Sequence, residues 1–294
     1  MNVIPVTTEN TSAYIDYCQR YGAEHDESYL PSEAFVPTEE YPAYLLTSGN
    51  EFVGAVGLMR TEPYTSKGKA RLTILHALDS SREAYESLTT AIRRHTEDLN
   101  SIYGFLPTAG HETRRLWEQL GFVVERYAYL LAYRSKERPI FDVPEGYSLS
   151  GLSQDDEADV RDLCDLWNSN YGHQLGFVGV TPERMTTWLG EDENIPGGAL
   201  LARHGDVPVG TAYVYRDDAE PTSAEVGMLS VHPDYRGQGL GRLMLRKAVN
   251  VARCHELSPV YLSVNAENAS AVNLYLSEGF VEDTAMVCYT LAVG

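Results

Sequence analysis

A cluster of three glycines and two arginines is the clearest sign of chemistry in this sequence. The stretch VHPDYRGQGLGRLML places Gly237, Gly239 and Gly241 at alternate positions, with Arg236 and Arg242 on either side. The first N–H groups of a helix have no partner inside the helix, and the helix dipole makes that end positive. Glycine lets another molecule approach such a backbone closely. The loop therefore predicts an anion site suited to phosphate or pyrophosphate.

The helix that follows the loop is locally basic. Residues 236–255 carry five cations and no carboxylate, although the whole chain has a formal net charge of −19. The cations are Arg236, Arg242, Arg246, Lys247 and Arg253. This reversal of charge matches a polyanionic ligand, but a solvated cationic helix face gives the same pattern. Neither G-x-x-x-x-G-K-[ST] nor G-x-G-x-x-G is present, so the loop is not one of the usual nucleotide signatures.

The elements around the loop predict a mixed α/β sheet. Residues 225–231, EVGMLSV, indicate a strand that ends at the turn His232-Pro233. Beyond the glycines, apolar residues recur at helical spacing up to Ala252. The segment 260–264, VYLSV, is rich in aromatic and β-branched residues and indicates another strand. Strands that alternate with helices favour a mixed sheet flanked by helices.

Two halves of the chain resemble each other, which predicts a duplicated domain. The segments 44–59 and 200–215 both indicate a hairpin around a glycine turn. Their glycines are 156 residues apart, and the pairs Gly121-Phe122 and Gly279-Phe280 are 158 apart. We expect two tandem domains, each with a mixed, mostly antiparallel central sheet flanked by helices. The predicted division is residues 1–133, a linker at 134–146 with charges, two prolines and a glycine, and residues 147–294.

Composition limits the kind of protein. The chain has 294 residues, 43% of them hydrophobic, and its charge argues against a general binder of nucleic acid or anionic membrane. No apolar run reaches the roughly 18 residues of a membrane helix, and the N-terminus lacks a secretory pattern. Four isolated cysteines without a CxxC predict neither a metal site nor a disulfide framework. We expect a cytoplasmic protein. The acidic net charge is compatible with a cationic substrate, but an acidic surface that serves only solubility explains it equally well.

A second motif, which follows the glycine loop in the sequence, indicates which kind of anion the loop binds. The segment 262–280 contains N-x-x-A-x-x-L-Y and closes with Gly279-Phe280. The motif residues are Asn268, Ala271, Leu274 and Tyr275. In this order, the strand, R-x-x-G-x-G and this motif resemble the GNAT superfamily of acyl-CoA-dependent N-acyltransferases. The resemblance is strong for residues 147–294 and only general for 1–133. The tandem arrangement is similar to that of mycothiol synthase and its relatives.

The resemblance implies acetyl-CoA, or another acyl-CoA, as co-substrate and needs no metal. It places the pyrophosphate on N–H groups of the loop, at Arg236, Gly237, Gln238, Gly239, Gly241 and Arg242. The pantetheine arm would pair with the strand near Leu229 and Val231, and Asn268 would bind the pantetheine or lie beside it. The partner would be an amine acceptor, small molecule or peptide.

The resemblance also implies two catalytic residues. Glu225 lies where several family members have a base that deprotonates the amine, and Tyr275 lies where a phenol donates a proton to the CoA thiolate. Strand alternation would put Glu225, Leu229 and Val231 on one face, unless a bulge interrupts it. A backbone N–H near Leu229 would stabilise the oxyanion. No covalent nucleophile is evident, which favours direct attack in a ternary complex. An exposed strand glutamate and a core tyrosine are the alternatives.

Other residues are weaker candidates for the acceptor side. The segment 166–179 would border that site, with Trp167, Asn170, Tyr171 and His173 as candidates, although His173 also suits a surface loop. The acids Asp217, Asp218 and Glu220 could attract an amine or could be solvated turn residues.

The first half departs from the motif. Residues 78–87, LDSSREAYES, have no glycine where R-x-x-G-x-G is expected. Trp117 replaces the tyrosine, and Gly110 replaces the asparagine. We expect this half to keep the fold without acyl-CoA chemistry. The whole chain is then an N-acetyltransferase or, alternatively, a catalytically silent acyl-CoA sensor or partner-binding protein. A nucleotide-phosphate binder unrelated to CoA is disfavoured by the second motif.

Overall fold

The protein forms two compact units. The structure, a computed structural model, describes residues 1–172, 177, 179–217 and 220–293. Unit 1 contains Met1–Ala128 and Thr284–Gly294, and unit 2 contains Tyr129–Asp283. The segment 134–146, predicted as a linker, contains no helix or strand and lies within unit 2.

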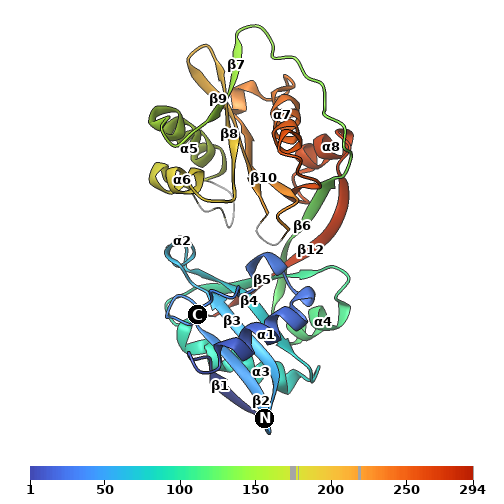
Figure 1. Ribbon diagram of the computed structural model, residues 1–294. Helices are drawn as coiled ribbons and strands as arrows, with labels where there is room; N and C mark the ends of the chain where they lie inside the picture. Colours follow the sequence, from blue (N-terminus) through green and yellow to red (C-terminus); the bar gives the residue numbers. More distant parts are fainter. Residues whose placement is uncertain (173–176, 178, 218–219, 294) are drawn as a thin grey trace. The chain divides into compact units, whose positions relative to one another are not determined.

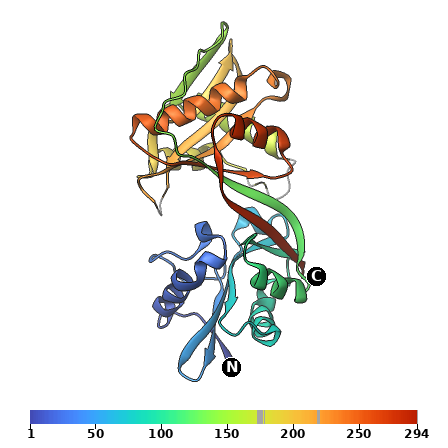
Figure 2. The same cartoon turned by 90° about the vertical axis from the view of Figure 1, so that its right-hand side faces the viewer.

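Unit 1 has its sheet between helices. The strand order is β1-β2-β3-β4-β5-β12, in which β4 and β5 run parallel and the other neighbours run antiparallel. Helix α1 packs on one face, and α3 and α4 pack on the other (Figure 2). In chain order, its elements are β1 (Asn2–Pro5), α1 (Thr11–Tyr21), η1 (Gly22–Glu24), η2 (Glu27–Tyr29), β2 (Ala43–Ser48), β3 (Glu51–Met59), α2 (Glu62–Thr65), β4 (Lys69–Ala77), α3 (Arg82–Ile92), η3 (Arg93–His95), β5 (Ser101–Pro107) and α4 (His111–Gln119).

Unit 2 repeats this plan. Its strand order is β6-β11-β10-β9-β8-β7, with α5 and α6 on one face and α7 and α8 on the other (Figure 1). The remaining elements of the chain are β6 (Val123–Tyr133), β7 (Tyr147–Leu152), α5 (Glu157–Tyr171), α6 (Pro182–Leu189), β8 (Asn194–His204), β9 (Val207–Arg216), β10 (Ala224–Val231), η4 (Pro233–Tyr235), α7 (Leu240–Cys254), β11 (Val260–Asn265), α8 (Ala269–Ser277) and β12 (Val281–Ala292), of which β12 belongs mostly to unit 1. The predicted mixed, mostly antiparallel sheet flanked by helices is confirmed.

The repeated hairpins form as the sequence predicts. Gly49 between β2 and β3 has φ +59°, and Gly205 between β8 and β9 has φ +58°. Left-handed backbone of this kind costs glycine little, whereas a Cβ would strain it. The two glycines therefore set the tight turns that bring each pair of strands together.

Two strands pass from one unit to the other. From Met286 to Ala292, β12 pairs with β5 of unit 1, in the register Met286↔Pro107 to Ala292↔Ser101. Conversely, Leu131 and Tyr133 of β6 lie in the hydrophobic core of unit 2. The last strand of each sequence repeat thus completes the core of the other unit, an exchange that the repeat pattern alone does not predict.

The described part of the chain contains no helix long and apolar enough to cross a membrane. In the same residues, no group of three or more His, Cys, Asp or Glu side chains is arranged to hold a metal ion. The four cysteines are free thiols, of which Cys18, Cys164 and Cys288 are buried and Cys254 is exposed.

Candidate active site

The glycine loop connects β10 to α7 with an open backbone. Gly237 has φ +75°, and Gly239, the N-cap of α7, has φ +85°. A Cβ added at either position would meet no atom within 4 Å, so open space lies directly against the backbone. At Gly241, in the first turn, a Cβ would come within 3.5 Å of Leu274 on α8. The loop offers N–H groups at a helix N-terminus to an anion, which fits a phosphate.

The cations near the loop divide into two kinds. Arg236 is exposed, and its Nε donates to the Val231 carbonyl at 3.0 Å. Arg242 and Arg246 share the carboxylate of Glu278, at 2.6 and 2.5 Å. Arg253 is buried and donates to backbone carbonyls, including that of Tyr133 at 3.1 Å. The patch available to an anion is thus smaller than the sequence predicts.

A cavity of about 300 Å³ adjoins the loop. Gln238, Gly239, Arg242 and Arg246 line one side of it. The other side comes from residues 141–147, and the Tyr147 hydroxyl donates to Gln238 Oε1 at 3.4 Å. The segment predicted as a linker therefore also shapes the surroundings of the glycine loop.

Strand β10 carries a bulge just before the loop. Its register with β9 shifts between Gly227 and Ser230, and Met228 has φ +52°, a value rarely adopted outside glycine. Glu225 lies opposite Tyr215, which packs with the α5 and α6 core. Beyond the bulge, Leu229 packs on the α7 side instead. The simple alternation that would put Glu225 and Leu229 on one face is therefore wrong, because the bulge reverses the phase.

A buried chain of hydrogen bonds holds this bulge. The Thr211 hydroxyl donates to the Met228 carbonyl at 2.7 Å and lies 2.8 Å from Ser230 Oγ. Asn170 Nδ2 donates to the same Ser230 oxygen at 3.0 Å. The Met228 carbonyl can only accept, so the direction of the whole chain is fixed: Asn170 donates to Ser230, Ser230 donates to Thr211, and Thr211 donates to Met228. Thr211 and Ser230 were not predicted from the sequence, although polar residues in an apolar strand pair are a visible signal.

Tyr171 connects the bulge to Tyr275. Its hydroxyl donates to the Leu229 carbonyl at 2.8 Å. Burial, and secondarily the neighbouring Tyr171, raises the pKa of Tyr275 well above its usual value. Tyr275 is 8% exposed, and its hydroxyl has no hydrogen-bond partner within the described chain. Tyr171 thus binds the Leu229 carbonyl and interacts electrostatically with Tyr275.

Strands β10 and β11 separate at this place. Their parallel register covers only Ala224↔Val260 and Glu225↔Tyr261 among the described residues. Beyond Glu225, β10 remains paired with β9 alone, up to Val231. Among the described residues, no strand covers the edge of β10 that faces β11 beyond Glu225, although the Leu229 and Val231 carbonyls already accept from Tyr171 and Arg236. An extended ligand with amide groups can add to an edge that no strand covers.

Other predicted residues lie near or outside this region. Asn268 is the N-cap of α8, and its Oδ1 accepts from the Ala271 N–H at 3.3 Å. Asp217 accepts from the Glu220 N–H at 2.9 Å, which is the behaviour of a turn acid. His173 and Asp218 lie outside the described residues.

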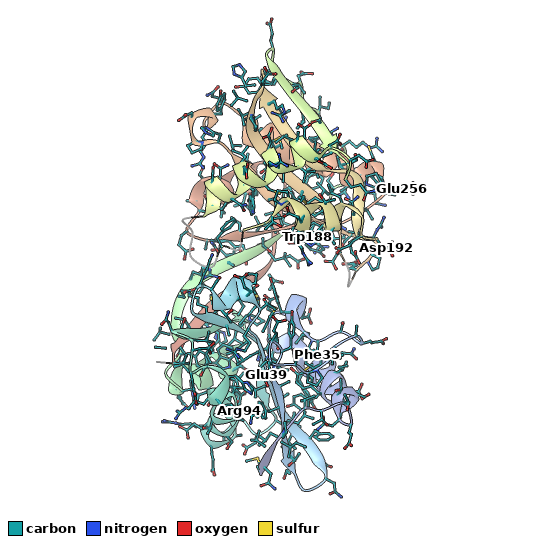
Figure 3. The ribbon with its side chains drawn as sticks, turned by 90° about the vertical axis from the view of Figure 1, so that its left-hand side faces the viewer. Phe35, Glu39, Arg94, Trp188, Asp192 and Glu256 are labelled. Carbon is teal, nitrogen blue, oxygen red and sulfur yellow. The ribbon has the colours of Figure 1, made fainter. Side chains whose placement is uncertain are left out.

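Aromatic rings cover the α5 and α6 face of the sheet. The ring of Trp167 lies 4.2 Å from that of Tyr171. Trp188 lies near the end of α6 (Figure 3). Its ring stacks on Tyr213 with centroids 6.3 Å apart, and Tyr213 stacks on Tyr215 at 5.3 Å. These rings lie on the same face of the sheet as Glu225.

In unit 1, the corresponding strand edge is already occupied. Strands β4 and β5 also separate, after Arg71↔Tyr103. There, His25 Nε2 lies 3.0 Å from the carbonyl oxygen and 3.2 Å from the nitrogen of Leu75. By the match of Gly54 to Gly210, Leu75 is the counterpart of Leu229. Burial lowers the pKa of His25 to about 3, so the ring is neutral.

Comparison with known proteins agrees with this geometry. Residues 160–280 match the model of the Acetyltransferase (GNAT) family. This part of the chain, within the second sequence repeat, therefore belongs to the GNAT acetyltransferase family. The whole chain, with its internal repeat, is similar in fold to a tandem GNAT protein from the clavulanic acid biosynthesis pathway. That solved structure matches with a TM-score of 0.72 and 18% identity, over all of this chain and 98% of its own length. At this identity the likeness concerns the fold.

Two sequence relatives are acetyltransferases by name. N-alpha-acetyltransferase RimI of Mycobacterium tuberculosis is 40% identical over 105 residues, which are 35% of this chain and 65% of the relative. Mycothiol acetyltransferase of Pseudarthrobacter chlorophenolicus is 27% identical over 198 residues, 65% of this chain and 55% of the relative. The chain thus spans less than two thirds of the length of either relative.

Proposed function

We propose that unit 2 transfers an acetyl group from acetyl-CoA directly to a primary amine. The gap between β10 and β11, beside the open glycine loop, is the observation that carries this function. The pyrophosphate would bind the N–H groups from Arg236 to Arg242, and the pantetheine amides would pair with β10 near Leu229 and Val231. This route supports placing the thioester at the bulge, between Glu225 on one face and Tyr275 on the other.

The reaction then needs three events at the thioester carbonyl. The neutral amine nitrogen forms the C–N bond, and the resulting oxyanion is stabilised by a backbone N–H near Leu229. The C–S bond breaks, and the CoA thiolate takes a proton, for which Tyr275 is the candidate donor. The phenol is protonated at neutral pH, as a proton donor must be, and burial raises its pKa further, which also makes it a weaker acid. The proton lost by the amine passes to Glu225, directly or through water.

Unit 1 would keep the fold without binding CoA. His25 takes up the backbone edge of Leu75, which is where a pantetheine arm would pair. No glycine-rich loop precedes α3, whose N-cap is Ser81. Free cysteines in the chain support a reducing compartment such as the cytoplasm.

Two measurements test the assignment on the full chain. Calorimetry should detect acetyl-CoA binding that Gly239→Asp abolishes, because the new side chain adds bulk and negative charge at the pyrophosphate position. Substitutions within residues 78–87 should leave that binding unchanged, and the opposite pattern would place the site in unit 1. The protein is also incubated with acetyl-CoA, a metabolite extract and α-amine peptides, and mass spectrometry should then reveal an acetylated product. Binding without any product would favour the silent sensor.

A further inference from the structure

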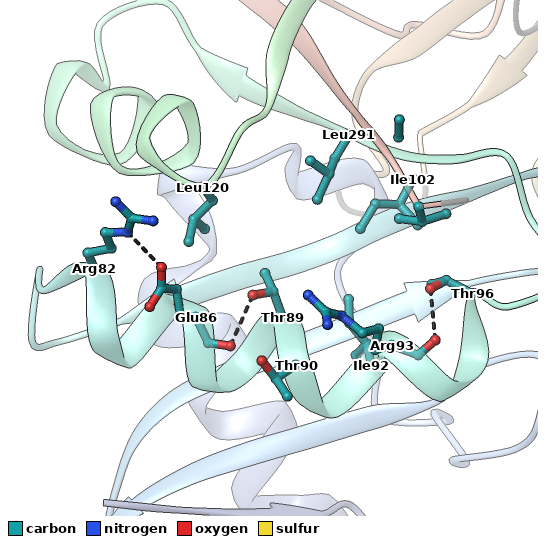
Figure 4. A pocket seen from close by; sticks show the side chains of 12 residues that line it. Arg82, Glu86, Thr89, Thr90, Ile92, Arg93, Thr96, Ile102, Leu120 and Leu291 are labelled. Atoms are coloured by element: carbon teal, nitrogen blue, oxygen red, sulfur yellow. Dashed lines mark hydrogen bonds and ion pairs between the residues drawn. The ribbon is translucent and has the colours of Figure 1, made fainter.

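Unit 1 contains a cavity larger than the one beside the glycine loop. It has a volume of about 540 Å³ and runs along α3 (Figure 4). Polar side chains of α3 and η3 line one side, among them Thr90 and Arg93. Apolar side chains line the other, among them Ile102, Leu120 and Leu291. The volume is in the range of ligand pockets, which is about 300–1,000 Å³. We call this cavity the α3 groove.

The internal repeat identifies the counterpart of the α3 groove in unit 2. By their burial, Leu88 and Ile92 of α3 match Ala248 and Ala252 of α7, each 160 residues later, which is two residues more than the distance between Gly121 and Gly279. At the same offset, Arg93 matches Arg253. The groove-lining face of α3 therefore corresponds to the face of α7 that carries Arg246, Asn250 and Arg253.

In unit 2 that face is covered by an extended segment of the chain itself. Arg246 Nη1 donates to the Ile140 carbonyl at 2.9 Å, and Asn250 Nδ2 donates to the Pro139 carbonyl at 2.7 Å. Arg253 donates to the carbonyls of Tyr133 and Ser135. Residues 135–140 thus lie along α7, held by side chains that bind their main-chain carbonyls.

In unit 1 the corresponding donors are unused. The Arg93 guanidinium and the Thr90 hydroxyl have no hydrogen bond or ion pair to another described residue, whereas Arg82 is paired with Glu86 at 2.6 Å. In place of Glu278, which binds two arginines of α7, unit 1 has the apolar Leu120. The α3 groove therefore offers carbonyl-binding donors beside an apolar wall.

We propose that the α3 groove binds an extended polypeptide segment of a partner protein, in the way that residues 135–140 bind α7. Main-chain carbonyls of the segment accept from Arg93 and Thr90, and an apolar side chain packs against Ile102, Leu120 and Leu291. The site is independent of acetyl transfer, because every residue that forms it belongs to unit 1.

A peptide with the sequence of residues 135–141, SKERPIF, is the probe. It is capped at both ends, labelled, and titrated into the full-length protein by fluorescence polarisation. We expect saturable binding that Arg93→Ala weakens about tenfold or more, as for the loss of a charged hydrogen-bond donor. Arg20→Ala is the matched control, since Arg20 is exposed on α1, on the other face of the sheet, and should leave binding unchanged.

Three outcomes would overturn the proposal. They are the absence of saturable binding up to millimolar peptide, equal binding by the parent protein and Arg93→Ala, and equal weakening by Arg20→Ala. Thr90→Trp is a second variant, because Thr90 is exposed and a large ring there fills the groove without disturbing the core. It should abolish peptide binding while the thermal unfolding midpoint stays within a few degrees of the parent.

Discussion

At the scale of single residues, Tyr275 combines deep burial with a hydroxyl that has no partner in the described chain. We predict that Tyr275→Phe lowers kcat by about 10²- to 10⁴-fold, the usual contribution of a general acid, and changes KM for acetyl-CoA much less. The substitution lowers kcat and not substrate binding, because the thiolate that the hydroxyl protonates forms only as the C–S bond breaks. Single-turnover kinetics at saturating acetyl-CoA measure the chemical step.

Tyr133→Phe is the control for this variant. The Tyr133 ring also contacts Phe280, with centroids 5.4 Å apart. The variant therefore removes a tyrosine hydroxyl from similar aromatic surroundings. Its turnover should match that of the parent. If Tyr275→Phe also keeps the parent rate while chemistry is rate-limiting, Tyr275 has no role in the mechanism.

Glu225 is a second residue whose role shows in the pH profile. We predict that Glu225→Gln slows transfer most at neutral pH and below, and that the deficit shrinks as pH rises. A glutamine keeps the shape but accepts no proton, and at higher pH more of the amine is already neutral, so the base matters less. The measurement is the pre-steady-state rate against pH, with Glu220→Gln in the preceding turn as control. A deficit that is constant with pH would indicate a packing role instead.

At the scale of elements, the bulge in β10 depends on a polar chain inside an otherwise apolar sheet. We predict that Thr211→Val lowers the free energy of unfolding by about 1–3 kcal/mol, because it leaves the Met228 carbonyl buried without its donor. It should also lower kcat about tenfold or more, since the Leu229 backbone loses its fixed position. Denaturant unfolding and turnover on the same sample provide both values.

Thr290→Val in β12 is the matched substitution. Its hydroxyl also donates to a strand carbonyl, that of Ile102 at 3.4 Å, but in unit 1. It should reduce stability without reducing kcat. Thr211→Val with lowered stability and an unchanged kcat would show that the hydrogen-bond chain serves the fold alone.

The elements also show how far the sequence could predict the site. Glycine spacing, helical periodicity and the repeat predicted the loop, α7 and the two hairpins, because these features depend on local backbone preferences. The phase of β10 beyond Met228 was not predictable, since one extra residue reverses every side chain after it. The pairing of Arg242 and Arg246 with Glu278, and the contact of His25 with Leu75, were missed because they join residues distant in sequence.

At the scale of the whole molecule, the His25 contact links the stability of the chain to pH. The folded-state pKa of His25 is about 3, below the usual value of about 6.5. Between these values the unfolded chain binds a proton that the folded chain does not, so stability falls as pH falls. One histidine of this kind lowers the free energy of unfolding by about 2 kcal/mol when the pH falls from 6.5 to 5.

We therefore predict that His25→Gln, although less stable at pH 7, loses less stability on acidification than the parent protein. Chemical denaturation at pH 7 and pH 5 gives the two differences. His111→Gln is the control, because His111 is exposed at the start of α4 and should leave the pH dependence unchanged. Parallel pH profiles for the parent and His25→Gln would show that His25 does not titrate in this range.

The passage of β12 into unit 1 has a consequence for biosynthesis. A ribosome synthesises β1 to β5 early, but the strand that pairs with β5 is made only after all of unit 2 has been translated. During that interval the β5 edge lacks its partner, and exposed strand edges promote misassociation. The first unit to be synthesised is therefore the last to be completed, and a gene cut between the repeats would deprive both products of a strand.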